Sequence, residues 1–170
     1  MSELMPIQLR ALGAADVNAV LRIQAQCYGD GFVEPREVFA RRLQGVGHCS
    51  WAAEQGGELV AYLAAYWSRP GAITPLNGDF TDYADASVLY LHDMAVSSVV
   101  AGQGLAQRMV QAVKTQARAR GVQRTALVSV QGSQLYWERQ GYKAESVANA
   151  AQQQHLASYG ESALYMVGII

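Results

Sequence analysis

The feature that most constrains the fold is the stretch of residues 88–120, which reads as an apolar strand, a glycine-containing turn and a long amphipathic helix. Residues 89–96 are almost all apolar, a pattern typical of a strand that is covered on both faces. In residues 105–117, apolar side chains recur at spacings of three and four, so the helix is expected to bury one stripe. This unit predicts an α/β protein in which the helix packs on a sheet.

The turn between strand and helix holds Gly102 and Gly104. The first N–H groups of a helix lack partners and carry about half an elementary positive charge, so a phosphate can bind there where glycines leave the backbone open. The turn therefore predicts a site for a phosphorylated cofactor. Two such glycines also occur in ordinary tight turns, and the turn alone leaves both interpretations open.

The composition is that of one globular domain. The chain has 170 residues, of which 51% are hydrophobic and 16% charged, enough to bury a sizeable core. A formal net charge of -1 gives no general attraction to nucleic acid or to a membrane surface, so neither partner is expected. The sequence shows neither a secretory signal nor an apolar run near the ~20 residues of a membrane span. Cys27 and Cys49 are expected to be reduced, and a cytoplasmic location is expected. No Cys/His cluster in the sequence suggests a metal site.

The remaining segments predict further strands and helices around residues 88–120. Two glycine-rich segments, 29–31 and 45–47, are expected to end the first two helices, and residues 149–160 are expected to form a polar surface loop. The long connection 68–86 is expected to be functional or mobile; its acidic residues would attract a cationic substrate or simply be solvated. Strands are expected at 7–12, 49–54, 59–67, 88–96, 125–130, 143–147 and 163–170, and helices at 16–28, 34–43, 105–120 and 133–138.

Two motifs resemble those of a known family. Residues 101–106, Ala-Gly-Gln-Gly-Leu-Ala, resemble the coenzyme A pyrophosphate loop of the GNAT superfamily of N-acetyltransferases, Q/R-x-x-G-x-G/A, with Ala101 at the Gln or Arg position. Residues 136–142 resemble the aromatic-Tyr-x-x-x-Gly-Phe segment that follows the fifth strand of this family. The resemblance implies a single GNAT-like domain over residues 1–170. Its sheet would be mixed and largely antiparallel, flanked by helices, with splayed fourth and fifth strands.

The resemblance also implies where acetyl-CoA would bind. The pantetheine arm would lie between the splayed strands, along the backbone of Met94, Ala95 and Val96, with the Met94 N–H directed at the thioester oxygen. Ser133 and Trp137 would contact the cofactor from the other side, whereas Val130 replaces a family Asn that contacts it. The pyrophosphate would lie on Ala101, Gly102, Gln103, Gly104, Leu105 and Ala106.

An amine acceptor requires a base, because a primary amine has a pKa of about 10 and is mostly protonated at neutral pH. His92 is the candidate, since it lies two residues before Met94 and histidine titrates near neutrality. Residues 91–96 also resemble the strand of arylalkylamine N-acetyltransferases in which a histidine relays the proton. The alternative is a hydrogen-bonded core histidine.

Two carboxylates are candidate substrate contacts. In a regular strand Asp93 is expected on the opposite face from His92, where it would anchor a neighbouring loop; proton relay and substrate binding are the alternatives. Glu34 follows the first helix and would either bind an ammonium group or simply begin the second helix.

The leaving thiolate of CoA requires an acid, and the sequence offers more than one candidate for it. Trp137 occupies the position where many family members have a tyrosine, and an indole cannot act as an acid. Tyr136, one residue earlier, is the candidate, with Tyr90 or water as alternatives.

The resemblance thus implies an N-acetyltransferase that moves an acetyl group from acetyl-CoA to a primary amine by direct attack in a ternary complex, without a metal. The acceptor would be a small amine or a lysine-bearing peptide. The alternative is a non-catalytic module of the same fold that senses acyl-CoA. A dinucleotide-binding domain, which would bind NAD, fits poorly because the glycine pattern is incomplete and no opening βαβ unit carries it. The last strand would pair with a second chain, giving a homodimer, or lie inside the sheet.

Overall fold

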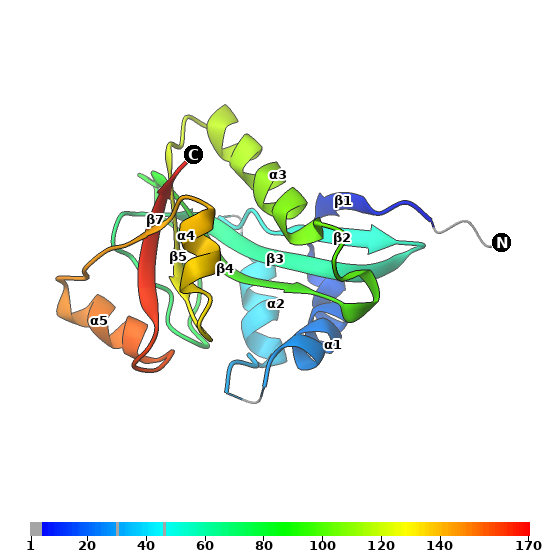
Figure 1. Cartoon of the computed structure of the whole chain (residues 1–170), viewed down its shortest axis with the longest axis horizontal. Helices are drawn as coiled ribbons and strands as arrows, with labels where there is room; N and C mark the ends of the chain where they lie inside the picture. Colours follow the sequence, from blue (N-terminus) through cyan, green and yellow to red (C-terminus); the bar gives the residue numbers. More distant parts are fainter. Residues whose placement is uncertain (1–4, 30, 46) are drawn as a thin grey trace.

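A single sheet runs through the computed structural model of the chain, which describes residues 5–29, 31–45 and 47–170 (Figure 1). The strand order is β1-β2-β3-β4-β5-β7-β6. The β4–β5 pair is parallel and the other neighbouring pairs are antiparallel. The strands are β1 (Gln8–Ala11), β2 (Trp51–Gln55), β3 (Glu58–Ser68), β4 (Val88–Val96), β5 (Arg124–Ser129), β6 (Lys143–Ala144) and β7 (Leu164–Ile169).

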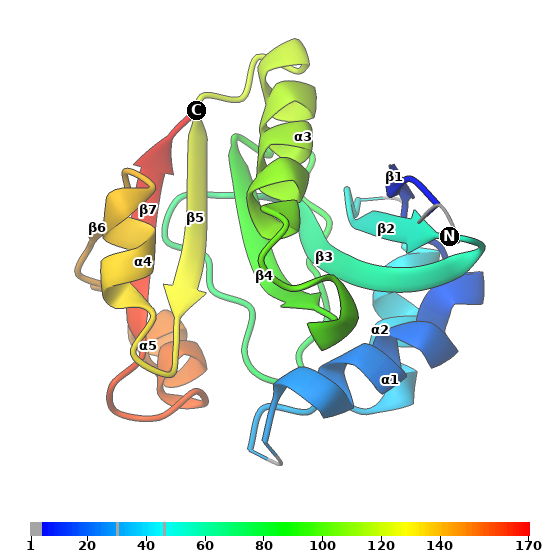
Figure 2. The same ribbon diagram turned by 45° about the vertical axis from the view of Figure 1, so that its right-hand side comes forward.

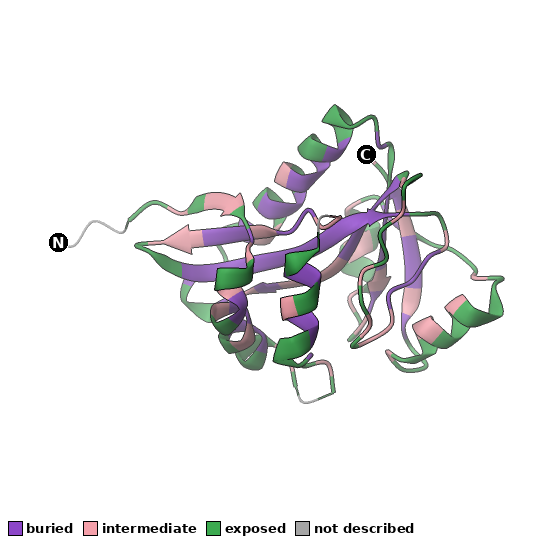
Figure 3. Cartoon of the chain, turned by 180° about the vertical axis from the view of Figure 1, so that it is seen from behind, coloured by how far each residue is buried: buried purple, intermediate pink, exposed green. Residues whose placement is uncertain are grey.

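Helices cover both faces of this sheet. Helices α1 (Val17–Cys27) and α2 (Arg36–Gln44) lie on one face, and α3 (Leu105–Ala119) and α4 (Gln134–Arg139) on the other (Figures 1 and 2). Helix α5 (Ala150–Ala157) lies beside β7, and two short 3₁₀ helices occupy Ala14–Asp16 and Ser98–Val100. Figure 3 shows the buried residues of the helices turned toward the sheet and the exposed ones turned outward. The fold is therefore the mixed α/β arrangement that the sequence predicts.

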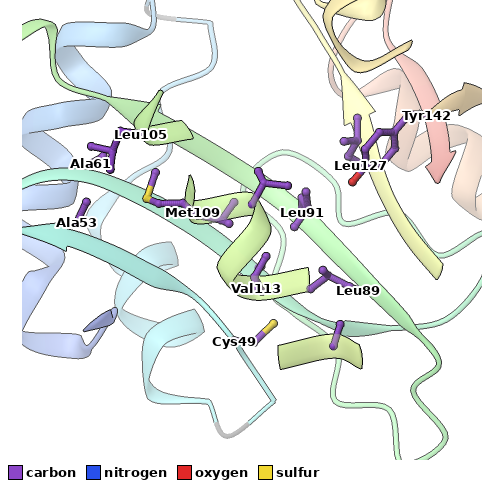
Figure 4. Packing of buried hydrophobic residues seen from close by; sticks show 14 of the residues in the cluster. Cys49, Ala53, Ala61, Leu89, Leu91, Leu105, Met109, Val113, Leu127 and Tyr142 are labelled. Atoms are coloured by element: carbon purple, nitrogen blue, oxygen red, sulfur yellow. The ribbon is translucent and has the colours of Figure 1, made fainter. Parts of the chain in front are cut away.

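The main core lies between α3 and the central strands. Ten of the eleven residues of β3 are buried, because helices cover it on both sides. Leu105, Met109 and Val113 of α3 pack against Leu89 and Leu91 of β4 (Figure 4). The apolar stripe of residues 105–117 is thus the buried face of α3, and it fixes the N-terminus of this helix over the end of β4.

Strands β4 and β5 separate after a short paired segment. Their ladder joins Val88–Leu91 to Arg124–Leu127 and goes no further among the described residues, although both strands continue beyond it. Figure 2 shows the two strands diverging below this point. The splayed fourth and fifth strands implied by the resemblance are therefore present.

Two of the predicted elements differ from the structure. The prediction of a surface loop at residues 149–160 was wrong, because this segment contains α5. Its apolar and polar residues are not separated onto two faces, and none of them is fully buried. The sequence nevertheless marks the start of this helix with an N-cap residue: the side chain of Asn149 accepts a hydrogen bond from the backbone N–H of Gln152 at 3.1 Å. The strand predicted for 143–147 is only the two-residue β6. Asp30 and Val46, in the two predicted glycine-rich helix stops, lie outside the described residues.

The N-cap of α5 gives the first testable prediction. Asn149→Ala removes the bond to the Gln152 amide, so we expect the free energy of unfolding to fall by about 1 kcal/mol in urea titrations. Gln154→Ala is the control, since this exposed residue lies within the same helix and alanine is the better helix former. Equal stabilities of the two variants would contradict the cap.

Candidate active site

A β-bulge in β4 places His92. Along β3, Ala64 pairs with Asp93 and the next residue, Ala65, pairs with Leu91, so His92 is the extra residue of β4. The bulge changes the alternation of side chains along the strand. His92 and Asp93 therefore line the same two cavities. The prediction that Asp93 lies on the opposite face was wrong because it assumed a regular strand.

Beyond the bulge, β4 presents backbone groups to the space beside β5. The Ser97 amide donates to the Val60 carbonyl at 2.8 Å, and hydrogen-bonded pairs alternate along an antiparallel ladder. Met94 and Val96 are therefore in non-hydrogen-bonded positions, with N–H and C=O turned away from β3. Both of these carbonyls accept hydrogen bonds from side chains at the end of α1. Tyr28 OH donates to Met94 O at 2.6 Å, and the Cys27 thiol donates to Val96 O at 3.2 Å.

A cavity of about 290 Å³, here called the gap cavity, lies where β4 and β5 separate. Met94, Asp93 and His92 line it from β4, together with Tyr28. From the β5 side it is lined by Leu127, Val128, Val130, Gln131, Ser133, Tyr136 and Trp137. The structure thus brings His92 and Met94 of β4 together with Tyr136 and Trp137 of the 136–142 segment around one cavity, whereas residues 101–106 do not line it.

The tyrosine candidates are placed differently. Tyr136 and Trp137 of α4 both line the gap cavity, with ring centroids 4.9 Å apart, and Tyr136 is 40% exposed. Tyr90 is 1% exposed and is not among the residues that line this cavity. Of the two, Tyr136 is the tyrosine that a group in the gap cavity would meet.

His92 is held by a buried carboxylate. Its Nε2 lies 2.9 Å from Glu34 Oε1, and Glu34 also forms a two-pronged ion pair with Arg42, at 2.7 Å and 2.6 Å. The backbone N–H of Asn77 donates a hydrogen bond to Glu34 Oε2 at 2.8 Å. Burial alone would raise the pKa of the Glu34 carboxyl, but the contact with His92 and the hydrogen bonds of Arg42 hold it well below its usual range. Glu34 is 2% exposed, and both of its carboxylate oxygens are engaged by protein groups.

The Glu34 carboxyl predicts a loss of stability in acid. Its pKa is lower in the folded chain than the value of about 4.3 of an unfolded one. Its contribution is therefore complete above that value and is lost as the pH falls toward the folded pKa. We expect urea unfolding of the wild type to lose stability more steeply between about pH 5 and pH 3 than that of Glu34→Gln/Arg42→Met.

A matched control for that experiment is Asp79→Asn/Arg41→Met, which removes an exposed ion pair between Arg41, the α2 neighbour of Arg42, and Asp79 of the 68–86 connection. This variant is expected to follow the wild-type pH dependence, because exposed pairs contribute little. Parallel curves for the wild type and the Glu34 variant would show that the buried carboxyl is not the source of the acid sensitivity.

Asp93 lies at the junction of the gap cavity and a smaller one of about 50 Å³, here called the side cavity. Its Oδ2 accepts a hydrogen bond from Tyr62 OH of β3 at 2.5 Å, so it anchors a strand residue, where a loop was predicted. Burial raises the pKa of this carboxyl. The side cavity is lined by Tyr28, Phe32, Glu34, Leu76, His92, Asp93, Val128, Val130 and Tyr159.

Two acidic residues of the 68–86 connection form surface ion pairs within the protein rather than facing the two cavities. Asp79 pairs with Arg41 at 2.8 Å and Asp85 with Arg69 at 2.9 Å, both on the surface. The connection itself is tied to the rest of the chain, since the side chains of Gln152 and Ser158 bond the amides of Ile73 and Leu76.

The turn before α3 leaves its backbone open. Gly102 and Gly104 have φ values of +79° and +68°, and no atom lies within 4 Å of a Cβ built on either. The first turn of α3 has no side-chain cap and no acidic residue, and the Arg108 amide bonds back to the Gly104 carbonyl at 3.1 Å. Leu105 is buried and anchors the turn. An uncapped 15-residue helix with open glycines before it fits a phosphate group.

Sequence reasoning missed four residues of this site. Tyr28, Arg42, Asn77 and Tyr159 come from four separate segments, and their positions become related only through the tertiary structure. No local pattern marks them. In the described part of the chain, no helix is long and apolar enough to cross a membrane. The same residues contain no cluster of three or more His, Cys, Asp or Glu side chains arranged to hold a metal.

Comparisons with known proteins agree with this arrangement. The structure is similar to that of the ribosomal-protein-S18-alanine N-acetyltransferase from Escherichia coli, with a TM-score of 0.70 and 16% identity over 97% of this chain and 94% of that one. It is also similar to the PaiA N-acetyltransferase from Thermoplasma acidophilum in complex with coenzyme A, with a TM-score of 0.66 and 11% identity over 98% and 100% of the chains.

A third similar structure is the GNAT-like decarboxylase GphF in complex with isobutyryl-CoA, with a TM-score of 0.71 and 15% identity over 95% and 98% of the chains. At these identities the likeness shows a shared fold. A search of curated protein sequences gives no match. The model of the acetyltransferase (GNAT) family, however, matches residues 17–142, which is most of the sequence. This chain therefore belongs to the GNAT acetyltransferase family.

Proposed function

We propose that this protein is an acetyl-CoA-dependent N-acetyltransferase that transfers an acetyl group directly to a primary amine in a ternary complex. The observation that carries the proposal is the gap cavity, where the free N–H edge of β4, a histidine and a tyrosine meet around one space. Two proteins of the same fold whose structures contain coenzyme A and isobutyryl-CoA support a coenzyme A thioester as the co-substrate.

The cofactor site would extend along β4 to α3. The N–H groups of Met94 and Val96, turned away from β3, would hold the pantetheine arm beside Ala95. The backbone of residues 101–106 would hold the pyrophosphate at the start of α3. Ser133 and Trp137 would close the gap from the β5 side.

Acetyl-CoA would supply an activated acetyl thioester. The Met94 N–H would stabilise the negative charge that develops on the thioester oxygen, an effect of roughly 2.7–4 kcal/mol for one such donor. His92 would take the proton that the amine loses as the C–N bond forms. Tyr136 would give a proton to the sulfur as the C–S bond breaks, because it is the tyrosine of α4 that lines the gap cavity.

The side cavity would receive the acceptor. Asp93 is the carboxylate at its junction with the gap cavity, and no cation is paired with it in the described residues. It would attract the ammonium group, while apolar and aromatic side chains would contact the rest of the acceptor. A small amine or the end of a lysine side chain suits a space of about 50 Å³.

The test is amine-dependent release of free thiol from acetyl-CoA, measured with a panel of monoamines, polyamines, amino acids and lysine peptides. Turnover that requires both the amine and the wild-type His92 would support the proposal. Tight binding of acetyl-CoA with no turnover across the panel would instead favour a sensing module of the same fold.

A further inference from the structure

We propose that Glu34 and Arg42 form a positioning pair that holds His92 in a single tautomer, with the proton on Nε2 and with Nδ1 left as the proton-accepting atom. This inference rests on the proposed function in one respect, namely that His92 is the base for the amine. Glu34 itself is a positioning residue, because it acts through His92.

The first step is the chemistry of the contact. A carboxylate only accepts hydrogen bonds, and Glu34 Oε1 lies 2.9 Å from His92 Nε2. Nε2 must therefore carry the hydrogen. In a neutral imidazole the other nitrogen then has the free lone pair. The partner of one ring nitrogen thus decides which nitrogen can accept a proton.

The second step is the state of the other nitrogen. His92 Nδ1 is the one buried side-chain nitrogen or oxygen that lacks a hydrogen-bond partner within residues 5–29, 31–45 and 47–170. A buried polar atom without a partner is costly and is rare in folded proteins. His92 lines both the gap cavity and the side cavity, so in the proposed complex a substrate amine would supply the missing partner, directly or through one water.

The third step is the role of Arg42. Its guanidinium neutralises Glu34 through two hydrogen bonds, and its Nε and Nη2 also donate to the Gly78 carbonyl at 2.9 Å and 2.6 Å. The ring of Phe80 lies 4.9 Å from the guanidinium carbon. The carboxylate is therefore held on both oxygens and has no free position to bind an ammonium group itself.

The ring of His92 is also fixed by packing. Phe80, Tyr90 and Tyr159 surround it, with ring centroids 5.4, 6.3 and 6.4 Å away, and its side chain is 2% exposed. A ring that is enclosed in this way cannot exchange its two nitrogens by rotating without moving its neighbours. The tautomer and the orientation are thus set together.

The informative variant is Glu34→Gln/Arg42→Met. The backbone N–H of Asn77 still needs an acceptor in the variant. The side-chain oxygen of the glutamine is therefore expected to take the place of Oε2, so that its NH₂ group faces His92 Nε2. Nε2 must then accept, and the proton moves to Nδ1. Replacing Arg42 at the same time avoids a buried unpaired charge, which would destabilise the fold.

Two readouts test the proposal. Long-range ¹H–¹⁵N spectra of histidine-labelled protein report the tautomer, with the His92 signals identified by their loss in His92→Asn. Steady-state kinetics with the best amine of the panel separate kcat from KM. Asp79→Asn/Arg41→Met, which removes the exposed ion pair between Arg41 of α2 and Asp79 of the 68–86 connection, is the matched control and should leave both readouts unchanged.

We expect the Nε2–H tautomer in the wild type, the Nδ1–H tautomer in the variant, and a kcat at least about 100-fold lower with a KM for acetyl-CoA within about threefold of the wild type. An Nδ1–H tautomer in the wild type, an unchanged tautomer in the variant, or a variant kcat within about threefold of the wild type would overturn the proposal. If the wild type acetylates no amine, the proposed function fails, but the wild-type spectrum still decides the tautomer.

Discussion

Substitution of His92 by asparagine is expected to lower kcat by about 10²–10⁴-fold, the usual contribution of a positioned general base. Its ring lines both cavities, and the unpartnered Nδ1 is the atom that would take the proton from the amine. The fold should tolerate the change, because Glu34 keeps its two-pronged pair with Arg42. The measurement is amine-dependent thiol release at saturating acetyl-CoA.

The matched control is His48→Asn. His48 is partly buried and lines a different cavity, with Arg41 and Asp79, so its loss should leave kcat within about threefold. A His92→Asn enzyme that keeps wild-type kcat would show that another group accepts the proton, and the base would then have to be sought at Asp93 or in solvent.

Substitution of Gly104 by valine is expected to weaken binding of coenzyme A by about 10- to 100-fold. Gly104 has a φ of +68°, a conformation that costs a residue with a side chain about 1–2 kcal/mol and a β-branched one more. The turn would then favour other conformations, and the N–H groups at the start of α3 would no longer converge on the pyrophosphate. Since 1.4 kcal/mol is a tenfold change in affinity, calorimetric titration resolves the effect.

Gly121→Val is a closely matched control. Gly121 follows the other end of the same helix, has a φ of +75°, and likewise has no atom within 4 Å of an added Cβ. Both variants should therefore lose similar amounts of stability, whereas only Gly104→Val should lose affinity. Equal affinities of the two variants would place the pyrophosphate away from this turn.

Much of the fold is readable from the sequence because it is encoded locally. The apolar stripe of residues 105–117 and the continuous apolar run of residues 89–96 give α3 and β4 almost to the residue. Helix α5 was missed because it packs little apolar surface, mainly that of Leu156, and is also held by polar side chains. His155 bonds the Ile73 carbonyl at 2.7 Å, and Tyr159, just after the helix, bonds the Thr74 carbonyl at 2.6 Å. The spacing of apolar residues along the sequence therefore does not predict such a helix.

The site was only partly predictable for a related reason. His92, Met94 and Tyr136 follow from motifs in continuous segments. The bulge that turns Asp93 to the same side as His92 depends on how β3 and β4 pair, which the sequence of β4 alone does not specify. The contact of Glu34 with His92, 58 residues further along the chain, likewise depends on the tertiary packing that brings the segment before α2 to β4. Long-range pairing therefore decides which of the candidate residues can act together.

The central claim is that acetyl-CoA binds between the splayed ends of β4 and β5, and thermal unfolding with added ligand tests it most directly. A ligand at about one hundred times its dissociation constant adds about 2.7 kcal/mol of stability. We expect acetyl-CoA and coenzyme A to raise the Tm of the wild type, NAD to leave it unchanged, and Gly104→Val to lose most of the shift. No shift with either coenzyme A species, or an equal shift with NAD, would contradict the account.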